Sequence, residues 1–113
     1  MPNSPQNVEP INITNQDALG YVKGALADEC VLGVSAHAKE RMLERDISIT
    51  QVRAVLKQGM ITESPTRDTS GRWSCRFEGY AAGEGLGVVV GFKFVNGARV
   101  VVVTAFHLNN YHR

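Results

Sequence analysis

The second half of the chain contains two apolar stretches that meet at a turn dipeptide: Leu86-Gly-Val-Val-Val-Gly-Phe-Lys-Phe-Val95, then Asn96-Gly97, then Ala98-Arg-Val-Val-Val-Val-Thr-Ala-Phe106. Both stretches are rich in valine and phenylalanine, which favour strands. Asn-Gly is the strongest short hairpin signal, because both residues tolerate the positive φ of a two-residue turn. We therefore expect an antiparallel hairpin that turns at Asn96-Gly97.

Two further strands are predicted before this hairpin. Trp73, Cys75 and Phe77 alternate with polar residues, a period of two that is typical of a strand with one buried face. Residues 60–63 add a short edge strand. The expected sheet therefore has four antiparallel strands. Loops are expected at residues 66–72 and 81–85.

The first half of the chain has helical periodicity, and three helices are predicted. Their expected N-terminal caps are Thr14 or Asn15, then Ser35, then Ser48 with Gln51 as a capping box. The first helix is expected to run to about Glu29, the second to near Arg45 and the third to Gly59. The apolar residues expected on the buried side recur at helical spacing: Leu19, Val22, Ala25 and Leu26, and later Ile49, Val52, Val55 and Leu56.

Helices followed by strands predict an α+β fold, with two to three N-terminal helices packed on a four-stranded antiparallel sheet. The chain has 113 residues, which is long enough for one modest core. We expect a single domain over residues 14–113. Residues 1–13 are rich in Pro and Asn and are expected to form a flexible lead-in.

The composition is that of a soluble globular protein, with 43% hydrophobic and 20% charged residues. The longest apolar run, residues 100–106, is too short to span a bilayer, and no secretory signal is visible, so we expect a cytoplasmic protein. Cys30 and Cys75 lack the spacing of metal ligands. We expect two reduced thiols, with a single disulfide as the alternative.

Charge is distributed unevenly along the chain. Residues 1–34 carry one lysine against four acidic residues, whereas residues 35–113 carry 11 Lys and Arg against 7 Asp and Glu. All eight arginines lie after residue 40. Because the planar guanidinium suits phosphates and carboxylates, this bias is compatible with a nucleic-acid partner.

His37, Arg41 and Arg45 lie four residues apart in the predicted second helix. A step of four residues advances a helix face by only about 40°, so the three side chains line one strip. A basic strip with a titratable imidazole suits phosphate chemistry. The alternative is an ordinary solvated helix surface, with Arg41 paired to Glu44.

Two more candidates lie on the predicted strands. Arg76 is on the face opposite Trp73 and its apolar neighbours, so it points into a groove if helices leave that face open. The alternative is a solvent-facing residue paired across the ladder with a glutamate. His107 follows the last strand, a common catalytic position, although a polar C-terminal tail is equally common. No metal site is expected, because the histidines and cysteines have no recognised ligand spacing.

These motifs resemble the bacterial "domain of unknown function 4258" family. The resemblance is carried by Ser35-Ala-His37-Ala38, Arg41-Met42, Arg45, Ile47-Ser48, a helix ending at Gly59, Met60-Ile61, and a valine-rich strand ending Val103-Thr104-Ala105-Phe106. It covers roughly residues 20–107. The family is similar to the RelE and BrnT ribonuclease toxins, which implies a small helical layer on a four-stranded antiparallel sheet.

In those toxins, basic residues on the sheet and the neighbouring helix bind RNA phosphates and stabilise the transition state of backbone cleavage. The resemblance therefore implies catalytic roles for His37 and His107, and RNA-binding roles for Arg41, Arg45 and Arg76. Arg76 and His107 correspond by approximate location only. The expected function is that of an RNA-interacting domain, a metal-independent endoribonuclease toxin that needs no cofactor.

A second hypothesis is a non-catalytic protein-binding module of a toxin–antitoxin pair or another small bacterial complex. Its arginines would pair with carboxylates of an antitoxin or other partner. Proteins that bind single-stranded RNA usually add aromatic platforms, and aromatic residues make up only 7% of this chain. This shortage of aromatic residues slightly favours the protein-binding hypothesis.

Overall fold

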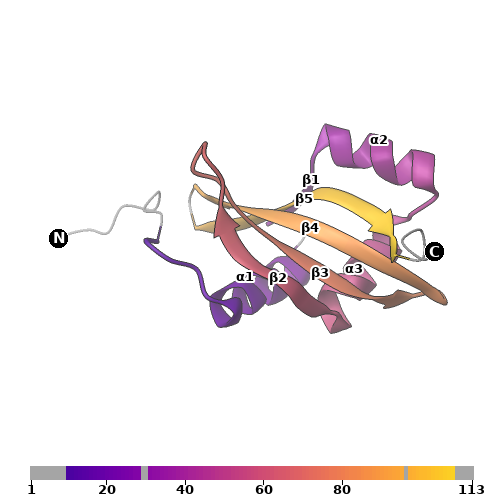
Figure 1. Ribbon diagram of the computed structural model, residues 1–113, viewed down its shortest axis with the longest axis horizontal. Helices are drawn as coiled ribbons and strands as arrows, with labels where there is room; N and C mark the ends of the chain where they lie inside the picture. The colour runs from indigo at the N-terminus through magenta and orange to yellow at the C-terminus, as the bar shows by residue number, and fades with distance from the viewer. Residues whose placement is uncertain (1–9, 29–30, 96, 109–113) are drawn as a thin grey trace.

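A computed structural model describes residues 10–28, 31–95 and 97–108 of the chain, and its fold is α+β as predicted (Figure 1). None of the described helices is long and apolar enough to cross a lipid bilayer. The elements in chain order are α1 (Asn15–Ala27), β1 (Leu32–Val34), α2 (Ala36–Arg45), α3 (Ile49–Gln58), β2 (Met60–Arg67), β3 (Trp73–Ala81), β4 (Glu84–Phe94) and β5 (Ala98–His107).

The helices begin at predicted caps. The side chains of Thr14, Ser35 and Ser48 each accept a hydrogen bond from the main-chain N–H three residues later, and the first and last of these form capping boxes. α1 ends at Ala27, and Glu29 lies outside the described residues. Gly59 ends α3 as predicted.

Gly59 is needed for space rather than for a left-handed backbone, since its φ is −79°. A Cβ at this position would collide with the carbonyl oxygen of Val55 and lie 2.7 Å from that of Glu78. The glycine therefore allows the end of α3 to touch β3 directly.

The prediction of a four-stranded antiparallel sheet is wrong, because the sheet has five strands and is mixed. Its order is β1-β5-β4-β3-β2, and β1 runs parallel to β5, with Leu32 opposite Val100 and Val34 opposite Val102. β1 has only three residues, too few to show a periodicity of their own. β2 is longer than predicted and reaches Arg67, so the expected loop begins at Asp68.

The β4–β5 hairpin is confirmed, although three residues rather than two separate its last pair, Phe94 and Ala98. Gly97 has the expected positive φ, 97°, and Asn96 lies outside the described residues. The β3–β4 connection, expected to be a loop, is a tight turn. Ala82 and Gly83 both have positive φ there, which is the geometry of a two-residue hairpin turn.

The two faces of the sheet have different surroundings. One face carries the predicted row of Trp73, Cys75 and Phe77, which is buried together with the inward residues of β4 and β5 beneath α1 and α3. Figure 1 shows α1 and α3 on that side of the sheet and α2 at its edge, beside β5. We call the second face the open face; its central residues are Arg76, Glu78, Tyr80, Gly85, Gly87, Val89, Thr104 and Phe106.

Two residues expected in the core are largely outside it. Leu19 and Ile49 are 44% and 42% exposed, whereas Val22 and Leu56, further along the same helices, are buried. Ile49 is the first residue of α3, so it lies at the end of the helix rather than over the sheet. Conversely, Ile13 is 3% exposed, so the core includes a residue of the predicted lead-in.

Truncating Leu56 to alanine is expected to lower the free energy of unfolding by about 2–5 kcal/mol, because it leaves a cavity beneath α3. The matched change, Ile49→Ala on the same helix, should cost no more than about 0.5 kcal/mol. Urea denaturation of both variants measures the difference. Equal losses would show that the buried side of α3 has been assigned wrongly.

Candidate functional site

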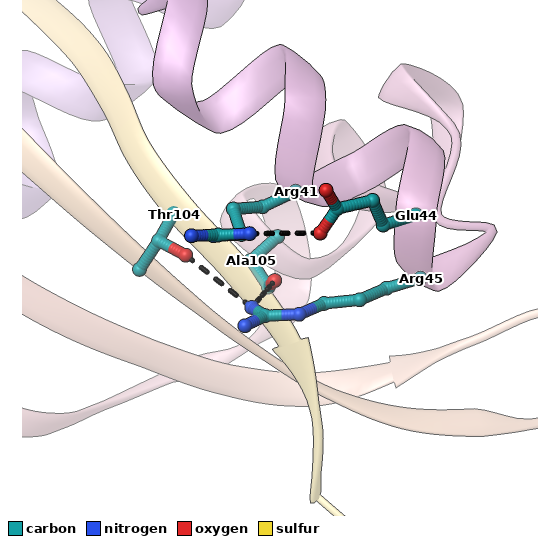
Figure 2. A network of polar contacts seen from close by, with 5 residues as sticks. All are labelled: Arg41, Glu44, Arg45, Thr104 and Ala105. Atoms are coloured by element: carbon teal, nitrogen blue, oxygen red, sulfur yellow. Dashed lines mark hydrogen bonds and ion pairs between the residues drawn. The ribbon is translucent and has the colours of Figure 1, made fainter.

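The predicted helix strip lies against an edge of the sheet. β1 ends opposite Val102, and α2 lies beside the remainder of β5 (Figure 1). Arg45 extends from α2 to this strand, where its Nη1 donates to the carbonyl oxygen of Ala105 at 2.8 Å and reaches Oγ1 of Thr104 at 3.5 Å (Figure 2). An unpaired strand edge leaves main-chain carbonyl groups without hydrogen-bond donors. Arg45 therefore has a structural role, because it supplies such a donor to β5.

His107 links three elements of the fold. Its Nε2 is 2.7 Å from the carbonyl oxygen of Arg45, one of the last carbonyls of α2, and its Nδ1 is 3.1 Å from Oε1 of Glu84 at the start of β4. Helix C-terminal carbonyls have no partner within the helix, so the imidazole supplies one. Both ring nitrogens of His107 are therefore already engaged.

Arg41 and His37 complete the strip but have different surroundings. Arg41 forms an ion pair with Glu44 at 2.8 Å, and Figure 2 shows its guanidinium extending toward Thr104, as that of Arg45 does. His37 lies in the first turn of α2, at the end remote from Arg45. Its exposed side chain makes no hydrogen bond or ion pair to the described residues.

Arg76 projects from β3 onto the open face, as the strand alternation predicted. Its Nε is 3.1 Å from Oε2 of Glu78, its Nη1 is 3.5 Å from Oε2 of Glu63 on β2, and its guanidinium lies 5.2 Å from the centre of the Phe106 ring. The glutamate pairing anticipated as the alternative is thus present. The Arg76 side chain remains 28% exposed.

Two aromatic rings on the open face were not identified from the sequence. A Cβ at Gly87 would lie 2.7 Å from Cε2 of Phe106, and one at Gly85 would lie 3.3 Å from Cε1 of Tyr80, so each ring lies over a glycine of β4. Gly85 and Gly87, at alternate positions of β4, are the sequence feature that could have predicted these rings. A strand that lacks side chains on one face leaves room for aromatic rings from the neighbouring strands.

The strand register brings the sheet and helix cations to one surface. Arg76 is opposite Val89, and Val89 is opposite Thr104, the residue that Arg45 reaches. Two strand spacings of about 4.8 Å separate Arg76 from Thr104. Arg41, Arg45 and Arg76 therefore border the same open face, whereas His37 is held apart at the start of α2.

The described residues give little support to metal binding or to catalysis by a cysteine nucleophile. They contain no group of three His, Cys, Asp or Glu side chains that could hold a metal ion. Cys75 is a buried free thiol, and burial raises its pKa from 9.0 to about 12. It is therefore a poor nucleophile at neutral pH. Cys30, and with it the question of a disulfide, lies outside the described residues.

Comparison with protein families gives a match over residues 34–107 to the family described as Domain of unknown function (DUF4258). The chain belongs to this family. No match was found among curated proteins or among solved structures. The DUF4258 region runs from the end of β1 to the end of β5 and contains all five predicted site residues, whereas α1 precedes it.

Arg45→Ala is expected to lower the free energy of unfolding by about 1.5–3 kcal/mol, because it removes a charged donor from a main-chain acceptor at the sheet edge. Arg41→Ala removes only an exposed ion pair and should cost about 0–1 kcal/mol. Thermal and urea unfolding of the two variants checks the difference. A larger loss for Arg41→Ala would contradict the structural role assigned to Arg45.

In a Cys30→Ser background, Cys75 should resist Ellman's reagent at pH 8 in the folded protein and react fully in denaturant. Because burial raises this thiol pKa, the folded state keeps the proton more tightly than the unfolded state. The free energy of unfolding should therefore fall as the pH rises from about 9 toward 12. The Cys75→Ala variant should lack the share of this fall that comes from ionisation of the thiol. Rapid labelling of the folded protein would contradict the burial of Cys75.

Proposed function

We propose that this DUF4258 protein is a RelE- and BrnT-like RNA-interacting domain that binds single-stranded RNA on the open face. The observation that carries the proposal is that Arg41, Arg45 and Arg76 border one sheet face that also presents two aromatic rings. Single-stranded RNA is recognised by this combination of cations for the phosphates and rings on which bases stack.

The rings differ in accessibility, which suggests different roles. Tyr80 is 76% exposed and is the better stacking platform. Phe106 is partly covered by the Arg76 guanidinium, so it supports that side chain and presents less surface to a base. An RNA strand lying from Tyr80 toward Arg45 would cross β3, β4 and β5.

The glutamates of the open face limit the expected affinity. Glu63 and Glu78 pair with Arg76, and Glu44 pairs with Arg41, so a phosphate must compete with a carboxylate for each guanidinium. We therefore expect weak binding at physiological salt that strengthens as these carboxylates are neutralised. If the arginines bind RNA, neutralising these carboxylates should raise the RNA affinity. If the arginines serve only to pair with the glutamates, the RNA affinity should not respond.

Cleavage of the RNA backbone is the activity that the toxin resemblance adds. Attack of a ribose 2′-oxygen on the adjacent phosphorus forms a cyclic phosphate and breaks the P–O5′ bond, so one group must accept the 2′-hydroxyl proton and another must protonate the leaving oxygen. His37 has a ring without partners among the described residues, whereas both nitrogens of His107 are engaged. The proposal therefore assigns proton exchange to His37, which requires the RNA strand to extend past Arg41 to the start of α2. No metal takes part in this proposed reaction, and its expected location is the cytoplasm.

The second candidate is the protein-binding module of a toxin–antitoxin or other small complex. It is favoured by one observation: Arg41 and Arg76 both bind carboxylates in the folded chain, and partner carboxylates could replace these. Under this hypothesis the open face binds an acidic protein surface and has no selective affinity for RNA.

The test is fluorescence anisotropy with a labelled single-stranded RNA at several salt concentrations. Arg76→Ala should weaken binding and reduce the salt slope by about one, and Tyr80→Ala should cost about 1–3 kcal/mol of binding. Lys57→Ala, a cation on α3 on the other side of the sheet, is the matched control and should change neither. Glu78→Gln should tighten binding more than Glu40→Gln, an exposed carboxylate of α2.

Incubating the same RNA with the protein and EDTA tests cleavage, which His37→Ala should suppress more than it suppresses binding. Absence of RNA binding at low salt, with all variants folded, would reject the RNA proposal and leave the protein-binding module. Equal effects of Glu78→Gln and Glu40→Gln would show that only total charge matters and would contradict a site at Arg76.

A further inference from the structure

A groove of about 760 Å³ lies between α1 and α3, on the side of the sheet away from the open face. Its apolar lining includes Leu19, Leu26 and Ala54, with the buried side chains of Val22 and Leu56 below. Leu19 is 44% exposed, although a leucine in a helix that covers a core is usually buried. The groove thus leaves apolar surface in contact with solvent.

Every charged residue that lines this groove is basic. Lys23 lies on the α1 wall, and Arg53 and Lys57 lie on the α3 wall, with no aspartate or glutamate among the lining residues. Arg53 is held in place, because its Nη2 donates to the carbonyl oxygen of Leu26 at 2.8 Å. Lys23 and Lys57 are exposed and have no ion-pair partner among the described residues.

We propose that this groove binds an acidic amphipathic helix of a partner protein. The lining residues span 19–27 of α1 and 50–59 of α3, a length of about 12–14 Å at 1.5 Å per residue, or two to three helical turns. A helix of that length presents apolar residues at i, i+4 and i+7 to the groove floor. Its flanking carboxylates then face Lys23 and Lys57.

The inference does not depend on the proposed RNA function. The groove and the open face are on opposite sides of the sheet, so a partner helix and an RNA strand can be bound together. The α1 wall also lies before residue 34, where the family match begins. The groove is therefore built in part from a segment that the matched region does not contain.

The test uses a designed helical peptide of about 14 residues, with leucine at i, i+4 and i+7 and glutamate at the flanking positions. It is titrated into the ¹⁵N-labelled full chain, and amide shifts are followed by NMR. Saturable shifts should be confined to α1 and α3. A second peptide with lysine in place of each glutamate should bind at least about tenfold more weakly, because its charges repel those of the groove.

Charge reversal on the protein provides the matched comparison. Lys23→Glu combined with Lys57→Glu should weaken binding of the acidic peptide by at least about tenfold, whereas Lys93→Glu, an exposed position on β4, should leave it unchanged. An NMR spectrum that is unperturbed away from the substituted residues shows that each variant is folded.

Three outcomes would overturn the proposal. The first is the absence of shifts in α1 and α3, and the second is equal binding of the acidic and basic peptides. The third is a concentration-dependent shift of the same residues without peptide, with a doubled mass in analytical ultracentrifugation, which would assign the groove to a second copy of the chain.

Discussion

One edge of β5 presents a row of main-chain hydrogen-bonding groups, and the chain satisfies that row with two different elements. β1 pairs with the first part, up to Val102, and the Arg45 guanidinium takes the carbonyl oxygen of Ala105 further along. An uncovered edge would leave these groups unpaired and open to other strands. Because α2 covers the second part through an arginine, the helix lies at the border of the open face, and that placement brings Arg41 and Arg45 to the same surface as Arg76.

The same arrangement divides the basic residues into structural and available ones. Arg45 and His107 connect α2 to the end of β5 and to Glu84, so they hold the site together. Arg41 and Arg76 pair with side-chain carboxylates, so an anion bound there must displace Glu44 or Glu78, and Tyr80 is exposed further along β3 from Arg76. The three arginines that border the open face are thus balanced by Glu44, Glu63 and Glu78, in keeping with a formal net charge of only +1 for the chain.

Local sequence signals predicted most of the fold. The caps at Ser35 and Ser48 and the hairpin after Phe94 each depend on neighbouring residues, and the alternation around Cys75 depends on a single strand. β1 was missed because its pairing with β5 joins segments almost 70 residues apart, and three residues carry no period. The hydrogen-bond partners of Arg45 and His107 were missed for the same reason. The spacing of residues within a helix does not indicate which main-chain carbonyl, here 60 residues away, its side chains will contact. The rings over Gly85 and Gly87 could have been anticipated from the alternating glycines of β4.

The central claim is that Arg45 holds α2 on the edge of β5, and amide hydrogen exchange measured by mass spectrometry tests it most directly. Comparison of the wild type with Arg45→Ala should show faster exchange in residues 36–45 and 103–107, which make up α2 and the strand segment beside it. Exchange in α3 and along the β3–β4 pairing should be unchanged, because neither contacts Arg45. Unchanged protection of α2 in the variant, or an equal loss throughout the sheet, would contradict the account.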